Sequence, residues 1–246
     1  MNPTIDLIKS HRSIRKFTEQ AIDESVLQQL LLAGQAAATS SFIQATSVIR
    51  VTDSSKRAAL VELTGQQKYV GSAPEFLVFC ADLYRNQQRV AGEGTDADFA
   101  WTEQFIAATV DVALFAQNVV IAAESAALGC CYIGGIRNNP DQVSRLLQLP
   151  DLVYPVFGLC LGHPDQNPQS KPRLPQQVAI HQDTYRPLAE VTNYIDAYDR
   201  QVSEYYIART RGKLDSSWSA QMATQAQQQK RPFMQKFLQS KGFLLK

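Results

Sequence analysis

The hydrophobic and polar positions of the chain follow two periods, one typical of strands and one typical of helices. Unbroken apolar runs at 75–82 and 153–162 are typical of buried strands, and 47–52 is a third strand candidate. Apolar residues at helical spacing, such as Leu27 and Leu30, predict helices between the strands. The order of these elements indicates a mixed α and β protein. The predicted helices are 6–15, 23–38, 54–63, 98–128, 141–147, 188–210 and 217–239, and the predicted strands are 47–52, 75–82, 130–133 and 153–162.

The predicted helix at 98–128 is apolar on nearly all sides. Its length is close to that of a membrane span, yet the apolar run contains Asp111, Gln117 and Glu124, which are unfavourable in lipid. We therefore predict a helix that is buried within the domain or between subunits. Gly129 follows this helix at a position where a left-handed cap is expected.

Two segments have no regular apolar pattern. The stretch 86–98 is polar and contains two glycines, so it is the best candidate for a mobile surface excursion. The connection 163–175 contains four prolines, which favour an extended backbone without ladder partners. Since no repeat or clear linker is present, we expect a single domain over 1–246, with a C-terminal helical excursion from about 188 to 246.

Composition and motifs exclude several classes of protein. The 246 residues have a formal net charge of only +1, which disfavours nucleic acid and anionic lipid as partners. Four cysteines without CxxC spacing, and the lack of a signal-peptide pattern, predict a cytoplasmic protein. Cys130 and Cys131 could be a reactive pair, but their apolar neighbours favour inert buried thiols. There is no metal-ligand spacing, GxSxG elbow, Walker loop or GxGxxG, so we expect no metal site and chemistry that is performed by a cofactor.

Two short basic clusters are the strongest candidate for a binding site. The first cluster contains His11, Arg12 and Arg15, and His11 and Arg15 are four residues apart, so on a helix they would share one face. In the second cluster Lys171 and Arg173 would project to the same side of an extended segment. Together they offer guanidinium and ammonium donors that suit a phosphorylated small molecule. Each cluster alone is more often a solvated surface feature, so that alternative stays open.

Ten segments of the sequence, taken in order, resemble one family. They include HRSIRKFT, TGQQKYV, FLVFCAD, AQNVVIAAESAALG, YIGGIRNN, FGLCLGHPDQNP, KPRLP and YDRQVSEYYIAR. The chain is similar to the nitroreductase superfamily and, within it, to the group of oxygen-insensitive NADPH nitroreductases and the NADPH-flavin oxidoreductase P. The resemblance extends from about residue 3 to residue 243.

The resemblance implies an α+β fold with a central, mostly antiparallel sheet flanked by helices, in an intertwined homodimer. It implies one FMN per subunit at the interface, with Ser40 and Ser41 contributed by the other subunit. No catalytic side chain is expected, because the flavin carries the chemistry. The positions that match the family's cofactor contacts are His11, Arg12, Ser13, Arg15, Ser40, Ser41, Gln67, Tyr69, Cys131, Tyr132, Ile133, Gly134, Gly135, Lys171 and Arg173.

The resemblance also implies contacts to NADPH and to an electron acceptor. Arg209 matches the family's NADPH-recognition arginine, Arg231 matches a basic residue near the substrate mouth, and Phe42 would stack on or close over the acceptor. The implied activity is ping-pong hydride transfer from NADPH to nitroaromatics, quinones or free flavin. Two alternatives stay open: a reductase that supplies reduced FMN to a partner enzyme, and a non-catalytic flavin-binding module.

The sequence departs from the family's pattern at two places. Cys130 and Cys131 stand where relatives usually have glycines, and a thiol there would alter access to the flavin or its hydrogen bonding. Leu214 stands where some relatives have a second basic residue for NADPH, although Arg211 or Lys213 could substitute. The resemblance still implies a preference for NADPH over NADH, and the strictness of that preference stays open.

Overall fold

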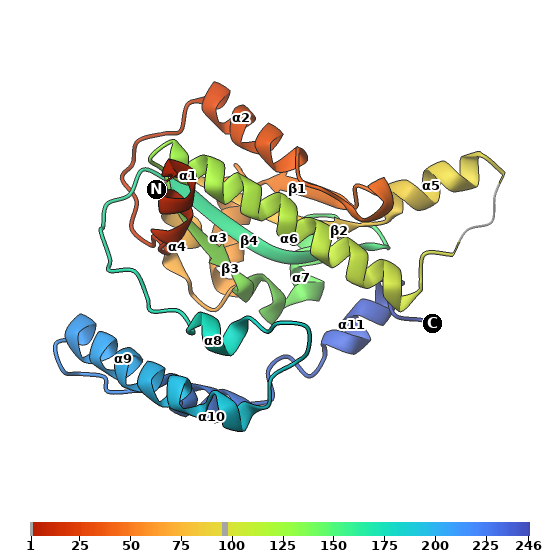
Figure 1. Ribbon diagram of the computed structural model, residues 1–246. Helices are drawn as coiled ribbons and strands as arrows, with labels where there is room; N and C mark the ends of the chain where they lie inside the picture. Colours follow the sequence, from red (N-terminus) through yellow and green to blue (C-terminus); the bar gives the residue numbers. More distant parts are fainter. Residues whose placement is uncertain (1, 95–97) are drawn as a thin grey trace. The chain divides into compact units, whose positions relative to one another are not determined.

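The computed structural model describes residues 2–94 and 98–246 of the chain (Figure 1). Its strands are β1 (Thr46–Arg50), β2 (Glu75–Asp82), β3 (Gly129–Ile133) and β4 (Val153–Gly162). Its α-helices are α1 (Pro3–Lys9), α2 (Glu24–Gln35), α3 (Ser54–Leu63), α4 (Lys68–Ser72), α5 (Tyr84–Gly92), α6 (Thr102–Ser125), α7 (Pro140–Leu146), α8 (Gln176–Ala179), α9 (Thr192–Thr210), α10 (Trp218–Ala226) and α11 (Met234–Ser240). Short 3-10 helices are η1 (Ser40–Phe42), η2 (Gly134–Asn138) and η3 (Leu188–Glu190).

Two compact units make up the chain. The first unit contains Met1–Asn167 and Arg231–Lys246, and the second contains Pro168–Lys230. The whole sheet belongs to the first unit, whereas the second consists of α8, η3, α9, α10 and their connections. The predicted site residues are therefore divided, since Lys171, Arg173 and Arg209 belong to the second unit.

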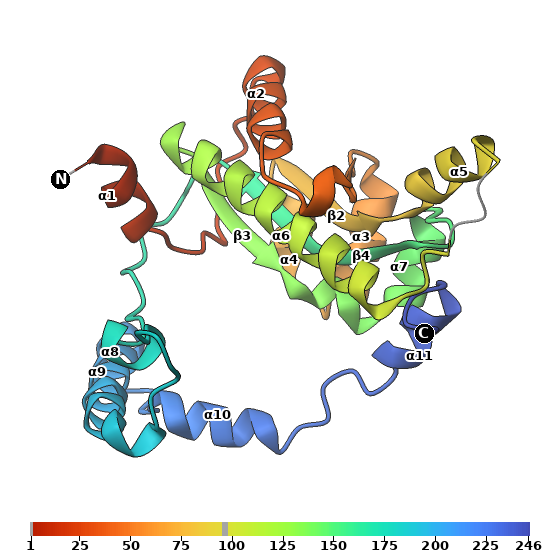
Figure 2. The ribbon, with the colours of Figure 1, turned by 45° about the vertical axis from the view of Figure 1, so that its right-hand side comes forward.

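The sheet has the strand order β1-β2-β4-β3, and its neighbouring strands are all antiparallel. This confirms the predicted α+β fold with an antiparallel sheet. Because side chains alternate across a strand, β2 divides its apolar residues between two layers. Leu77 and Phe79 pack with α2 and α6 on one face, while Phe76 and Val78 pack with α3, α4 and α7 on the other (Figures 1 and 2). All positions of β2 are buried, as its unbroken apolar run predicts.

The N-terminal helix is shorter than predicted. α1 ends at Lys9, so the prediction that His11 and Arg15 share a helix face is wrong. The backbone N–H of Ile14 donates to the carbonyl oxygen of Cys130 (2.8 Å), and Ser13 forms a parallel bridge with the same residue. Ile14 is only 4% exposed, so burial of its side chain favours this extended path over a further helical turn.

The C-terminal end of α6 also differs from the prediction. Ala127 is the left-handed residue (φ 59°), whereas Gly129 is already the first residue of β3. A Cβ atom at position 129 would lie 2.8 Å from the side chain of Ile14, so close packing requires this glycine. By length and composition α6 could cross a membrane, but its buried side packs against α2 and β2. It is therefore a core helix of the first unit.

Three further differences concern helix boundaries. Most of the polar stretch 86–98 belongs to helix α5 or to the turn after it, and its residues 95–97 lie outside the described part of the chain. The predicted helix 217–239 is two helices, α10 and α11, because Arg231 has a φ of 55° and precedes Pro232. Helices α4 and α8 are too short for the apolar period to reveal them.

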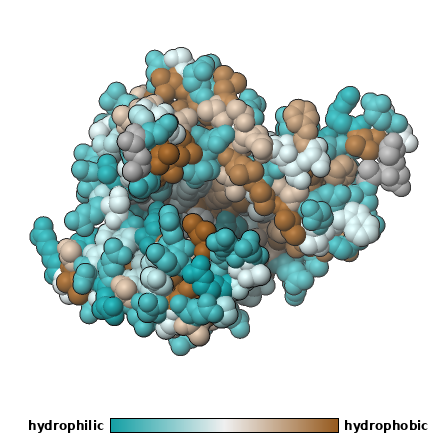
Figure 3. Space-filling view, in the orientation of Figure 1, coloured by the Kyte–Doolittle hydropathy of each residue, from teal (hydrophilic) through white to brown (hydrophobic). Residues whose placement is uncertain are grey.

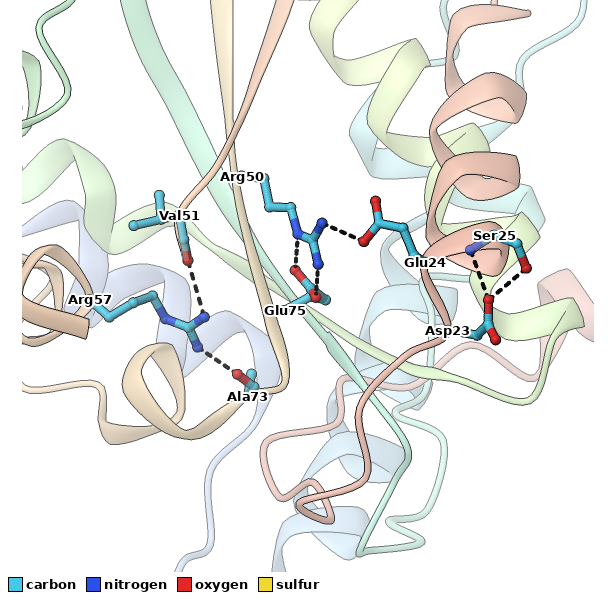
Figure 4. A network of polar contacts seen from close by, with 8 residues as sticks. All are labelled: Asp23, Glu24, Ser25, Arg50, Val51, Arg57, Ala73 and Glu75. Carbon is cyan, nitrogen blue, oxygen red and sulfur yellow. Dashed lines mark hydrogen bonds and ion pairs between the residues drawn. The ribbon is translucent and has the colours of Figure 1, made fainter. Parts of the chain in front are cut away.

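Two arginines of the first unit each join several neighbouring segments through hydrogen bonds (Figure 4). Arg50 of β1 makes a bidentate pair with Glu75 (2.6 and 2.8 Å) and also donates to Glu24 of α2 (2.7 Å). Arg57 of α3 is buried, and its bonds hold helix α4 in place. It donates to the backbone carbonyl oxygens of Val51 (3.3 Å), Val70 (2.8 Å), Gly71 (3.2 Å) and Ala73 (2.5 Å).

Replacement of Arg57 by glutamine is expected to lower the free energy of unfolding by about 3 kcal/mol, because buried carbonyl oxygens lose their charged donor. Arg50→Gln is the matched control. The Arg50 side chain is 34% exposed, and solvent screening limits its expected loss to about 1 kcal/mol. Urea unfolding followed by circular dichroism measures the free energy of unfolding of both variants. Equal losses would contradict the larger contribution to stability that we assign to Arg57.

Candidate functional site

The segment 11–15 lies in an extended conformation beside β3. His11 Nδ1 lies 2.6 Å from Oε1 of Glu124, near the end of α6. The side-chain amide of Gln166 donates to the carbonyl oxygen of Ser13 (3.5 Å). Arg12 and Arg15 are exposed, although the backbone between them is fixed to β3. The segment therefore presents two guanidinium groups to solvent from a well-anchored backbone.

Three other predicted cofactor contacts lie together near this segment. The hydroxyl of Tyr69 donates to Oε1 of Gln67 at the start of α4 (3.1 Å). Burial raises the pKa of Tyr69, and the guanidinium of Arg15 is close enough to act in the opposite direction. A Cβ atom at position 135 would lie 2.5 Å from the carbonyl oxygen of Thr64, so Gly135 lets η2 pack closely on the end of α3. Residues from three separate segments thus meet at one end of β3.

Arg231 contacts the turn that follows β3. Its guanidinium donates to the carbonyl oxygen of Gly134 (3.0 Å) and to Oδ1 of Asn138 (2.9 and 3.1 Å). Gly134 and Tyr132 also line a cavity of about 380 Å³ on the α6 side of the sheet. The predicted residue at the substrate mouth therefore lies at the same end of β3 as the predicted cofactor contacts.

Ser40, Ser41 and Phe42 lie elsewhere in the first unit. The backbone N–H of Ser40 donates to Asp111 of α6 (3.0 Å), whereas His11 contacts Glu124 of the same helix. Glu124 follows Asp111 by thirteen positions, which correspond to about 20 Å along a helix axis. Within one chain the structure therefore does not bring Ser40 and Ser41 to the segment 11–15.

Lys171 and Arg173 of the second unit lie close to two tyrosines of α9. Lys171 Nζ is 5.1 Å from the centroid of the Tyr206 ring, and the Tyr198 hydroxyl donates to the carbonyl oxygen of Pro172 (3.1 Å). Burial raises the pKa of Tyr198, and both cations oppose this increase because they lie near its hydroxyl. The pair thus gathers on one side of its segment, and its convergence with the segment 11–15 stays a prediction.

Arg209 lies in the last turn of α9. Its Nη1 donates to the hydroxyl of Tyr205 (3.0 Å), and its Cζ lies 5.8 Å from the centroid of that ring. These two contacts orient the guanidinium while the side chain stays exposed. Arg211 then ends the helix in the left-handed conformation (φ 56°). The geometry is that of an exposed, oriented cation at the end of a helix.

Three residues that shape this region were not among the predicted site residues. Glu124 and Asp111 are carboxylates in a mostly apolar helix. Because a buried charge requires a partner, the sequence alone indicated that both residues have specific contacts. Asp111 is 1% exposed, and the side chain of Glu124 is 13% exposed. Asn138, which holds Arg231, has no pattern in the sequence that marks it.

The four cysteines are free and buried, which confirms the prediction of buried thiols. Cys130 and Cys131 belong to opposite layers of the core, and Ile133 is buried as well. Their side chains point into the core, so the backbone of this strand is the part that remains for contact with a ligand. Burial raises the pKa of each thiol.

These thiols are expected to make the protein less stable at alkaline pH. Above about pH 9 the thiols of the unfolded chain lose protons, while the buried thiols of the folded chain keep them. The unfolded state then binds fewer protons, so the free energy of unfolding falls by about 1.4 kcal/mol per pH unit for each such thiol. Urea unfolding at several pH values measures the slope, which Cys160→Ala should reduce. An unchanged slope in that variant would show that the Cys160 thiol does not cause the alkaline loss of stability, and the prediction would fail.

Comparison with known proteins agrees with this arrangement. The family model described as Nitroreductase family matches residues 8–163, and the model described as Nitroreductase family, C-terminal domain matches residues 171–246. The chain is 45% identical over 246 residues to FMN reductase (NADPH) of Bacillus subtilis (strain 168), with 99% of each chain covered. It is 43% identical over 243 residues to the oxygen-insensitive NADPH nitroreductase of Salmonella typhimurium, again with 99% of each covered.

A solved structure shows the same likeness in three dimensions. The crystal structure of nitroreductase A from Vibrio parahaemolyticus superposes with a TM-score of 0.91 at 45% identity, and 100% of each chain is covered. Both halves of the sequence and the fold therefore lead to one conclusion. The chain belongs to the nitroreductase family.

Proposed function

We propose that this protein is an FMN-dependent oxidoreductase that oxidises NADPH and reduces nitroaromatics, quinones or free flavin. Relatives named FMN reductase (NADPH) and oxygen-insensitive NADPH nitroreductase support NADPH as the donor and flavin and nitro compounds as acceptors. The observation that carries the proposal is the extended segment 11–15, which is fixed at Cys130 to β3, the strand that leads into Gly134 and Gly135.

The cations predicted to hold the FMN phosphate have the chemistry that this role requires. Arg12, Arg15, Lys171 and Arg173 form no ion pair with a carboxylate of the described residues. A guanidinium offers paired N–H donors to phosphate oxygens, and an ammonium adds a compact charge. The side chains of Gln67 and Tyr69 add neutral hydrogen-bonding groups near Arg15. The residues present therefore fit FMN.

Bound FMN supplies the electron transfer between NADPH and the acceptor. The chain binds and orients the three molecules, and no side chain has to act as acid or base. Arg209 binds the phosphate that distinguishes NADPH from NADH, and the basic clusters fix the cofactor. Phe42 covers the acceptor, and Arg231 keeps the turn at Gly134 in place. Alternate use of one open site by donor and acceptor gives ping-pong kinetics.

We further infer a homodimer, because α6 exposes an apolar stripe. Ile106, Val110 and Leu114 follow each other at intervals of four residues and are 43–50% exposed. Figure 3 shows hydrophobic side chains gathered along this side of the first unit. Such a stripe is typical of a subunit interface. A second copy would also supply Ser40 and Ser41, which lie about 20 Å along α6 from the segment 11–15 of their own chain.

The proposed activities differ in the molecule that accepts the electrons from NADPH. The name FMN reductase of a 45% identical relative supports free FMN as an acceptor. In the second function that we consider, the reduced FMN is then delivered to a partner enzyme. We place this chemistry in the cytoplasm, since free and buried cysteines fit a reducing compartment.

Steady-state turnover with NADPH tests the proposal. The purified protein is loaded with FMN and assayed with nitrofurazone, 1,4-benzoquinone and free FMN in parallel. We expect turnover with all three, and a much higher kcat/KM for free FMN would favour the flavin-supplying function. A protein that binds FMN but oxidises no NADPH would be a flavin-binding module, and the proposal would fail.

A further inference from the structure

Asp111 is an unusual residue of α6. Its carboxylate is 1% exposed, and no cation of the described residues pairs with it. Its two oxygens instead accept two backbone N–H groups, from Ser40 (3.0 Å) and Ala45 (3.3 Å). A charge buried in an apolar helix is costly, so its retention requires a role for these two bonds. They close the two ends of the loop 40–45 on one side chain.

The loop between these two bonds is strained. Ser41 (φ 47°), Phe42 (φ 59°) and Gln44 (φ 50°) are all in the left-handed region, and none of them is glycine. Residues with side chains adopt this region only where their surroundings enforce it, and such residues gather at functional sites. The loop is therefore held in a conformation that it would not adopt by itself.

Helix α5 holds the same loop from its other side. The side-chain amide of Asn86 donates to the carbonyl oxygen of Ile43 (2.9 Å). The guanidinium of Arg85 donates to the carbonyl oxygen of Gln44 (3.1 Å). Donors from α5 thus hold the loop's carbonyl groups, while Asp111 of α6 holds its N–H groups.

The result of this arrangement is an exposed aromatic ring. Phe42 is 81% exposed, although a cavity of about 840 Å³ lies next to the loop and is lined by Phe42, Ile43, Asp111 and Phe115. The hydrophobic effect favours burial of the ring in this cavity. The bonds of Asp111 oppose that collapse because they fix both ends of the loop.

We propose that Asp111 is a positioning residue for the electron-acceptor site. It fixes the loop 40–45 so that Phe42 stays available to stack on a wide, planar acceptor. This inference rests on the proposed function, since it assigns the acceptor site to Phe42. Loss of the clamp lets Phe42 turn toward the cavity, so wide acceptors lose a stacking surface and narrow acceptors lose little.

The test compares Asp111→Asn with Asn118→Ala. Asn118 is a matched control, because it lies on α6 about two turns after Asp111 and donates to a backbone carbonyl oxygen outside the loop 40–45, that of Ala33 in α2. In Asp111→Asn the ratio of kcat/KM for free FMN to kcat/KM for 1,4-benzoquinone is expected to fall about tenfold. Asn118→Ala should leave the ratio unchanged even if it lowers stability. Phe42→Ala should reproduce the fall, and the double variant Asp111→Asn/Phe42→Ala should show no further fall.

Amide hydrogen exchange supplies the second readout and requires neither FMN nor NADPH. The backbone amides of 40–45 are expected to exchange at least about tenfold faster in Asp111→Asn than in the wild type. Unchanged exchange, an equal change of the acceptor ratio in Asn118→Ala, or additive effects in the double variant would overturn the inference. If the wild type reduces no acceptor, the proposed function fails, while exchange still decides whether Asp111 clamps the loop. If Asp111→Asn does not fold, Asp111→Ser replaces it, since serine also lacks the carboxylate and has a smaller side chain.

Discussion

Arg15→Gln is expected to weaken FMN binding by about 10- to 100-fold, the cost of one charge-assisted hydrogen bond to phosphate. Arg15 extends from a backbone that is fixed by the contacts of Ser13 and Ile14 to β3, so the start of its side chain is held in place. Glutamine keeps most of the length of the side chain and removes its charge. Equilibrium dialysis or flavin fluorescence measures the dissociation constant.

Lys16→Gln is the matched control for this experiment. Lys16 is the next residue of the same extended segment and is also exposed. Lys16 carries the same charge one position further along the segment, and it is not among the positions that match the family's cofactor contacts. We expect FMN affinity to change little in this variant. Equal, salt-sensitive losses in both variants would mean that the segment attracts anions only in a general way, and the phosphate site would be wrong.

Arg209→Gln is expected to lower kcat/KM for NADPH by about 10- to 100-fold and to leave kcat/KM for NADH and the affinity for FMN unchanged. The reason is that a charge-assisted bond to the additional phosphate of NADPH is lost. Tyr205 orients the guanidinium at the end of α9 through a hydrogen bond and its ring. Steady-state kinetics with both dinucleotides measures the change.

Two other variants decide whether Arg209 is the right residue. Arg200→Gln changes an exposed arginine of the same helix and should preserve the preference for NADPH. Lys213→Gln tests whether a neighbouring cation substitutes at the position where Leu214 replaces a basic residue. A loss of NADPH preference in Lys213→Gln, with none in Arg209→Gln, would contradict the assignment.

The strands and the larger helices could be predicted because their patterns are local. β2 and β4 have unbroken apolar runs between polar or glycine-rich ends, and the structure places both strands at their predicted bounds. Helix α3 also has its predicted bounds, since Asp53 caps its N-terminus by accepting the N–H of Lys56. In these elements a short stretch of sequence contains all the information that its conformation requires.

The errors arose where distant contacts decide the conformation. The helical prediction for 11–15 was wrong because the bond to the Cys130 carbonyl and the burial of Ile14 come from a partner far along the chain. The same contact explains Gly129, which has the side chain of Ile14 against it. The carboxylates of α6 were visible in the sequence, but their roles depend on the loops that pack against the helix. Family resemblance named the site residues, and only the structure showed what holds them.

The central claim is that the chain binds FMN and reduces it with NADPH. Its most direct test is an anaerobic titration of the purified, FMN-loaded protein with NADPH, with NADH in parallel, followed by the visible absorbance of the flavin. We expect a yellow protein that bleaches fully with NADPH and more slowly with NADH. A protein that takes up no FMN, or bound FMN that keeps its colour in excess NADPH, would contradict the account.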